Sequence, residues 1–370
     1  MSEQTSQLAE VLYLSEKLDG AKIPPELKEK ISIQIKRLRR MARQGLAAGE
    51  YEVVAKYVDW CLKVPWYSIT PDNLDLNNAK QIMDKFHYGS EDVKSVVLEY
   101  LAVLNRKNKI QDTEFAAPVL AFVGVQGAGK TCLANAIAKA LGRPFTRISL
   151  GALGHSSELR GSPFQNLGAR PGSIVRAIVQ AQAMNPVILL DEFDKVSGNE
   201  AARHDFMAIM LELLDPAQNK TFRDQYLDYP IDLSNVLFIS TANRFTTIAR
   251  ELLDRLEFIE FEDYSMEEKL VIAKNYLFPK VLRHAGLTKE ELVITEDAWP
   301  ILVKAFAQEM GVRRLERNFE KLARGVIKEI VLGRSKQIQI NAENAPEYAK
   351  KALPNIEEIR GIDYTVNNEE

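Results

Sequence analysis

The segment from Pro118 to Leu141, PVLAFVGVQGAGKTCLANAIAKAL, constrains the fold more than any other part of the chain. A short apolar run ends in glycine, a glycine-rich loop follows, and apolar residues at helical spacing come next. Residues 124–131 fit the spacing G-x-x-x-x-G-K-[ST], in which backbone N–H groups surround phosphates. Because strand, loop and helix follow in this order, a chance glycine loop is a poor explanation, and the segment predicts nucleotide binding.

Two further apolar runs end in polar residues. NPVILLDEFD (185–194) ends in acids, and NVLFISTAN (235–243) ends in an amide. Alternating strands and helices predict a parallel sheet covered by helices, in which ligands sit at the carboxyl ends of the strands. The non-functional alternatives are that the acids lie at the surface at the end of a strand and that the asparagine is an ordinary turn residue. The phosphate loop earlier in the chain makes both alternatives less favoured.

The predicted chemistry is that of ATP or ADP with Mg²⁺. Lys130 is expected to reach the outer phosphates, and Thr131 and Asp191 to hold the magnesium ion. Glu192 is expected to polarise the attacking water and Asn243 to orient it, since phosphoryl transfer needs positioning and charge stabilisation. The further phosphate-loop contacts are predicted at Gly124, Gln126, Gly127, Ala128, Gly129 and Cys132.

Composition indicates which class of protein the chain belongs to and in which compartment it is expected. The 370 residues are 46% hydrophobic with a net charge of −3, which favours a soluble globular protein over a dedicated nucleic-acid binder. The two cysteines are too few for a disulfide framework, and no apolar run reaches membrane-spanning length. We therefore expect a cytoplasmic protein with no membrane partner. A basic helix near residues 28–43 is read as a solvated face, with DNA contact the less favoured alternative.

The pattern divides the chain into four parts. Residues 1–74 are expected to form an N-terminal helical segment, and 75–262 the α/β domain. Residues 263–350 predict an α-helical lid, and 351–370 carry little apolar periodicity and predict a loose tail.

Several longer strings carry a resemblance that the phosphate loop alone does not. The chain resembles the ATPase part of Lon proteases, within the AAA+ superfamily, from about residue 25 to 350. The supporting strings are YVDWCLKVPW, HYGSEDVKSVVLEYLAV, ELRGSPFQNLGARPGSIVRAI, NPVILLDEFDKVS, LELLDPAQNKTFRDQYLD, LLDRLEFIEFEDYSMEEKLVIAKNYLFPK and GVRRLER.

The resemblance implies a P-loop AAA+ domain with a parallel sheet, preceded by helices and followed by a helical lid, in a ring of six identical chains. It implies that His87 and Tyr88 lie on the adenine side of the nucleotide. Arg255 looks like the finger that reaches a neighbour's nucleotide, and Arg313 like the lid arginine on the chain's own nucleotide. From the residues alone, both arginines could equally form surface ion pairs.

The sequence also departs from the family. It ends before any Ser–Lys peptidase domain, so no peptidase activity is expected from this chain. Where the family has an aromatic–aliphatic pair gripping the substrate, this chain has Asn166 and Leu167. An amide grips apolar groups less well than a ring, although Phe164 lies two residues earlier. Val125 and Gln126 replace prolines usual in the family, and ATP binding is expected to survive this change.

Two functions compete. The first is an ATP-driven unfoldase acting on unfolded or damaged proteins, with a separate peptidase as a further candidate partner. The second is a nucleotide-dependent scaffold or regulatory module without processive translocation, which the altered substrate loop favours. A DNA remodeller is a third, less favoured alternative, because the charge balance is mildly acidic.

Overall fold

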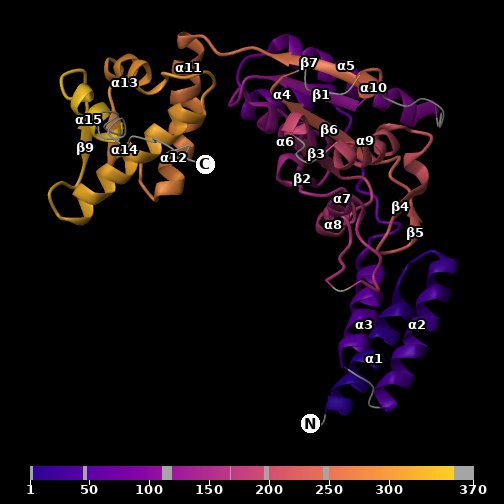
Figure 1. Cartoon of the computed structure of the whole chain (residues 1–370). Coiled ribbons are helices and arrows are strands. Elements are labelled where there is room, and N and C mark those ends of the chain that lie inside the picture. The colour runs from indigo at the N-terminus through magenta and orange to yellow at the C-terminus, as the bar shows by residue number, and fades with distance from the viewer. Residues whose placement is uncertain are drawn as a thin grey trace, which may run out of the picture. The chain divides into compact units, whose positions relative to one another are not determined.

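The computed structural model describes residues 3–44, 48–110, 119–166, 168–195, 200–244 and 250–353. These residues fall into two compact units, drawn in Figure 1. The first unit contains the chain up to residue 124 together with 130–261, and the second contains 125–129 together with the chain from 262. The N-terminal helices and the sheet therefore belong to the same unit, although the sequence separates them at residue 74. The three predicted domain boundaries, at residues 74, 262 and 350, stay predictions.

Three helices begin the first unit, and Figure 1 shows them lying alongside one another. They are α1 (Glu3–Gly20), α2 (Pro25–Gln44) and α3 (Ala48–Lys63). In α2, Leu27, Ile31, Ile35 and Leu38 recur every three to four residues and are buried. Such spacing places one apolar stripe against the neighbouring helices and leaves the basic residues on the outside.

A five-stranded parallel sheet forms the centre of the first unit, in the order β2-β3-β6-β1-β7. Its strands are β1 (Val119–Gly124), β2 (Phe145–Ser149), β3 (Val187–Asp191), β6 (Leu237–Ala242) and β7 (Leu256–Phe261). All residues of β3 and β6 are buried, as expected of strands covered on both faces. Since the strands are parallel, the carboxyl ends of β3, β6 and β1 lie next to one another.

Helices and a small hairpin surround this sheet. The α4 helix packs on α6, and α5 contacts β7. The helices are α4 (Leu76–Phe86), α5 (Glu91–Ile110), α6 (Lys130–Leu141), α7 (Ser157–Arg160), α8 (Ser173–Ala181), α9 (Glu200–Leu214) and α10 (Arg250–Leu253), and the antiparallel hairpin pairs β4 (Phe222–Asp224) with β5 (Tyr229–Ile231).

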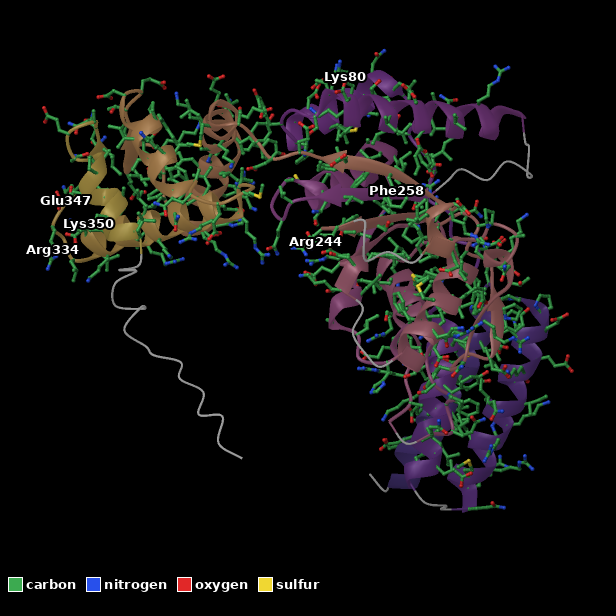
Figure 2. The ribbon with its side chains drawn as sticks, turned by 45° about the horizontal axis from the view of Figure 1, so that its top comes forward. Lys80, Arg244, Phe258, Arg334, Glu347 and Lys350 are labelled. Carbon is green, nitrogen blue, oxygen red and sulfur yellow. The ribbon has the colours of Figure 1, made fainter. Side chains whose placement is uncertain are left out.

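The second unit is mainly helical. Its elements are α11 (Met266–Ile272), a π-turn (Ala273–Leu277), α12 (Phe278–Ala285), β8 (Leu292–Ile294), α13 (Ala298–Phe306), α14 (Arg313–Val331), β9 (Ile338–Ile340) and α15 (Ala345–Ala352). Phe319 of α14 packs edge-on against Phe306 and Phe278, which fixes the centre of this unit. Charged side chains including Arg334, Glu347 and Lys350 group at one end of it (Figure 2).

Side-chain hydrogen bonds connect the linker between α3 and α4 to the segments that precede β2 and β3. Arg143, directly after α6, makes two hydrogen bonds of 2.6 Å to the carboxylate of Asp72. Both side chains are only about a tenth exposed, at 10% and 12%. Nearby, the Asn185 side chain bonds both backbone groups of Thr70 at 2.8 Å. A bidentate pair in such a place fixes the path of the linker.

We predict that Arg143→Ala lowers the free energy of unfolding by about 2–4 kcal/mol, because it leaves the Asp72 carboxylate without its main partner. Chemical denaturation of both proteins measures the difference. The exposed pair of Lys56 and Glu52 supplies the control, and Lys56→Ala should change stability by less than about 0.5 kcal/mol. Equal losses in the two variants would contradict the prediction.

Candidate nucleotide site

The phosphate loop, residues 124–131, leaves β1 along a path that only glycine permits. Gly124 has a φ of 153°, and a Cβ atom there would lie 2.1 Å from the carbonyl oxygen of Phe261 in β7. Because β7 is the neighbouring strand, the loop must begin without a side chain at this point. The resulting path opens α6 at Lys130.

Lys130 is held at the junction of two strand ends. Its ammonium group donates to the carbonyl of Gly124 at 2.5 Å and to the Asn243 amide oxygen, directly after β6, at 3.3 Å. The residue is 8% exposed. Burial lowers the pKa of Lys130, and the nearby carboxylates of Asp194 and Asp191 oppose this shift. The structure therefore brings the predicted lysine and asparagine into contact.

Asp191, the last residue of β3, has two partners. Arg147 of β2 forms an ion pair with it at 2.5 Å, and the Thr241 hydroxyl of β6 donates a hydrogen bond to it. The same hydroxyl accepts the backbone N–H of Glu192 at 3.2 Å. Asp191 is thus held by the strands on both sides of β3.

Glu192 turns away from the strand with a φ of 60°, an uncommon conformation for a residue with a side chain. Its carboxylate pairs with Lys195 at 2.6 Å. The next acid, Asp194, accepts the backbone N–H of Asn243 at 3.1 Å. The two predicted adjacent acids therefore point to different partners, as successive side chains at a strand end should.

The segment predicted on the adenine side lies beside the start of α6. The Cys132 thiol donates to the carbonyl of Phe86 at 2.9 Å. His87, which ends α4, is 3% exposed and packs edge-on against Phe261 with ring centres 6.0 Å apart. Tyr88 follows and is half-buried. Thr131, at the start of α6, is exposed.

The tip of the phosphate loop, residues 125–129, belongs to the second unit and packs against other residues of that unit. The Tyr264 hydroxyl donates to the carbonyl of Ala128 at 2.9 Å, and the backbone N–H of Val312 donates to that of Gly127 at 3.2 Å. Gly311 lies so close that a Cβ atom there would be 2.3 Å from the carbonyl of Gln126. Arg313 begins α14 at this contact, with its backbone beside Gly127.

Arg255 lies directly before β7, between α10 and that strand. Its guanidinium pairs with Asp215 at 3.3 Å and donates to the carbonyl of Glu251 at 3.3 Å. Hydrogen bonds from the Ala217 backbone and from the side chains of Gln218 and Arg255 hold the pKa of Asp215 below its usual value. Arg255 is thus fixed in its own chain, about a third exposed.

The predicted substrate loop, residues 161–172, joins α7 to α8. Asn166 is exposed, whereas Phe164 is half-buried and stacks on Tyr57 of α3 at a ring distance of 4.2 Å. Leu167 lies outside the described residues. At the base of the loop, the buried carboxylate of Asp224 accepts the backbone N–H of Gly172 at 2.8 Å.

Sequence reasoning missed several partners in the site. Arg147, Lys195, Thr241, Asp215 and Tyr264 were not singled out, although each touches a predicted residue or the phosphate loop. Thr241 carried a usable signal, because it lies two residues before Asn243 and so on the same side of the strand. Lys195 also carried a local signal, because it lies three residues after Glu192. The contacts of Arg147, Asp215 and Tyr264 join segments far apart in the sequence, so spacing could not reveal them.

Comparisons with known proteins agree with this geometry. The family "ATPase family associated with various cellular activities (AAA)" matches residues 120–264, and the "Lon protease AAA+ ATPase lid domain" matches residues 283–338. The chain is an AAA+ ATPase module of the Lon family. The AAA match covers the sheet from β1 to β7, and the lid match runs from α12 to β9.

Named relatives of this module are similar over most of its length. "Lon protease 2" of Myxococcus xanthus is 42% identical over 332 residues, which are 90% of this chain and 39% of that protein. "Lon protease" of Dictyoglomus thermophilum and "Lon protease 2" of Thermus thermophilus are also 42% identical, over 92% of this chain and 42% of each protein. The chain therefore spans about two fifths of the length of these relatives.

Two features are absent from the described residues: a cluster of metal-binding side chains and a membrane-spanning helix. Within the ranges that the structure describes, no group of three or more His, Cys, Asp and Glu side chains is arranged to hold a metal ion. In the same ranges, no helix combines the length and the apolar character needed to cross a membrane.

We predict that Tyr264→Phe weakens ADP binding about two- to tenfold, since it removes one buried hydrogen bond to the phosphate loop and keeps the ring. Titration with a fluorescent ADP analogue measures the affinity. Tyr13→Phe is the matched control, because Tyr13 is 59% exposed. Unchanged affinity in Tyr264→Phe would show that the contact with Ala128 does not support the loop.

Asp224 yields a prediction about pH. Burial raises the pKa of its carboxyl from 3.8 to about 6, although its three backbone N–H partners favour the charged form. The folded chain then binds a proton more tightly than the unfolded chain between these values. Its contribution to stability should therefore fall as pH rises from about 4 to about 6 and stay constant above. Denaturation of wild type and Asp224→Asn across this range should show a difference that changes with pH; parallel curves would contradict the assignment.

Proposed function

We propose that this module binds Mg-ATP and hydrolyses it at the carboxyl ends of β1, β3 and β6. The contact between Lys130 and Asn243 carries the proposal, because it joins the phosphate loop to the strand end that follows the acids. ATP supplies the phosphoanhydride bond whose cleavage releases the energy. Lys130, Thr131 and the loop N–H groups would bind the phosphates, at the positive end of α6.

The donor set suits a magnesium–nucleotide complex rather than a metal held by protein alone. Mg²⁺ is commonly bound through one or two carboxylates together with substrate phosphates. Asp191 and the exposed Thr131 would supply one carboxylate and one hydroxyl. The ion pair of Asp191 with Arg147 occupies the same carboxylate, so magnesium binding would compete with Arg147.

Glu192 and Asn243 would position the attacking water. Glu192 now pairs with Lys195, whose side chain is 47% exposed and can move into solvent. When this pair opens, the carboxylate is free to accept a proton from water at the strand end. His87, Tyr88 and Cys132 would line the adenine side.

Arg255 and Arg313 would supply the remaining positive charge. Arg313 begins the helix whose first turn lies beside Gly127, so it would act on the nucleotide of its own chain. Arg255 would reach the nucleotide of a neighbouring chain in a homo-hexameric ring, where a positioned arginine stabilises the transition-state charge.

The work of the module would be the unfolding and translocation of unfolded or damaged proteins. The relatives that it matches are named proteases, and a peptidase acting on the translocated chain is a candidate partner. The loop at 161–172, with exposed Asn166, would contact the polypeptide. A nucleotide-dependent scaffold is the second candidate, favoured by the polar side chain at 166 and by the packing of Phe164 against Tyr57.

We predict that the purified chain turns over ATP, that unfolded protein stimulates it, and that Glu192→Gln lowers turnover about 100-fold or more while ATP stays bound. Arg255→Ala should abolish most turnover only when the chains are assembled. A coupled ATPase assay with and without reduced, carboxymethylated lactalbumin, beside sedimentation velocity, measures both effects.

Matched controls are Glu52→Gln and Arg37→Ala, which change exposed side chains on the N-terminal helices. Turnover near zero with ATP still bound would overturn the motor and leave the scaffold. Turnover that unfolded protein does not stimulate, in an assembled ring, would also favour the scaffold.

A further inference from the structure

Three aromatic rings from three separate segments meet at the substrate loop. Phe164 of the loop stacks on Tyr57 of α3, with ring centres 4.2 Å apart and planes at 27°. Tyr226, in the turn between β4 and β5, lies edge-on to Phe164 at 6.4 Å and 6.1 Å from Tyr57. The two longer distances lie in the range of about 4.5–7 Å in which aromatic pairs attract one another, and Phe164 and Tyr57 stack slightly closer than that range. We call these three rings the aromatic dock.

Two of the three rings belong to residues that make hydrogen bonds outside the loop. Tyr57 is fully buried, and its hydroxyl donates to the carbonyl of Leu227 at 3.2 Å. Tyr226 is 3% exposed, and its backbone N–H donates to Asp224 at 2.9 Å. Phe164 is the half-buried member and belongs to an otherwise exposed stretch. The dock is therefore a prepared surface that receives one side chain of the loop.

The base of the same loop is closed independently of the dock. Asp224 accepts the N–H of Gly172, and a Cβ atom on Gly161 would lie 3.0 Å from the same carboxylate. A Cβ atom on Gly172 would lie 1.9 Å from the carbonyl of Leu159, so the two ends of the loop approach as bare backbone. The loop thus has a fixed base, and Phe164 connects its outer part to α3 of the N-terminal helices.

We propose that Phe164 is a positioning residue that anchors the substrate loop to α3, so that the N-terminal helices set the position of the loop. The proposal deepens the proposed function and rests on it for the role of the loop in substrate contact. A displacement of α3, for example by a partner bound to α1–α3, would move Tyr57 and, through the stacked ring of Phe164, the loop. Phe164 does not grip the polypeptide in this arrangement, because its ring is already occupied.

Hydrogen exchange of the full chain tests the anchor without reference to activity. Phe164→Leu keeps an apolar side chain and removes the stacking. The amides of Ser162 and Asn166, which donate to the carbonyls of Arg170 and Pro163, should therefore exchange about two- to tenfold faster. Phe164→Tyr keeps a ring and should restore slow exchange. Tyr57→Phe keeps the stacked ring and loses the bond to Leu227, so the loop should stay protected.

The matched control is Tyr229→Leu. Tyr229 packs edge-on against Trp66 at 5.5 Å, beside the same hairpin, but neither residue belongs to the loop. Loop exchange should stay at the wild-type rate in this variant. If Phe164→Leu leaves loop exchange unchanged, or if Tyr229→Leu raises it equally, the anchor is overturned.

The ATPase assay separates this proposal from the function beneath it. In a motor, Phe164→Leu should lower the stimulation by unfolded protein at least threefold, measured relative to the basal turnover of the same variant, and Phe164→Tyr should restore it. If wild type shows no stimulation but exchange follows the prediction, the anchor stands and the motor fails. If wild type is stimulated and Phe164→Leu is stimulated equally despite a loosened loop, the link from anchor to substrate is overturned.

Discussion

The site depends on the buried ammonium group of Lys130, which lies where two strands end. Lys130 donates to the carbonyl of Gly124 and to the side-chain amide oxygen of Asn243. Burial disfavours that charge, and the lowered pKa expresses the cost. An anion placed above the loop would offset the cost, which is a physical reason for a phosphate to bind there. The geometry follows from the strand order, since β1 must lie beside β6 for Lys130 to reach Asn243.

The acids near this lysine are held by other cations. Arg147 pairs with Asp191, and Lys195 pairs with Glu192. Each pair is half open to solvent on the cation's side, so its net stabilisation is small and exchange for another partner costs little. Under the proposed function, a magnesium ion would replace Arg147 at Asp191 without leaving a buried charge unpaired. The resting site is neutralised by side chains that are able to move.

The sequence predicted the strands that carry the candidate site better than the elements around them. Apolar runs ending in Gly124, Asp191 and Asn243 predicted three strands and a parallel α/β fold, which the structure confirms. The edge strands β2 and β7 were not singled out, because partly exposed strands lack a continuous apolar run. Arg147 could not be found from spacing, since its contact with Asp191 exists only because β2 pairs with β3. The roles of the individual site residues stay predictions.

The predicted substrate loop shows that the presence of an aromatic residue in a loop does not by itself make its ring available for substrate contact. An aromatic ring at 164 could have replaced the missing ring at 166, yet Phe164 turns toward Tyr57 and leaves the exposed amide of Asn166 at the surface. Burying the ring of Phe164 against other rings removes apolar surface from water and is favourable, whereas leaving the ring exposed is not. Under the proposed function, a polar tip on an anchored base would hold a polypeptide through hydrogen bonds to its backbone, which do not depend on the identity of its side chains. Such a loop would trade apolar grip for tolerance of sequence, and its position would depend on α3.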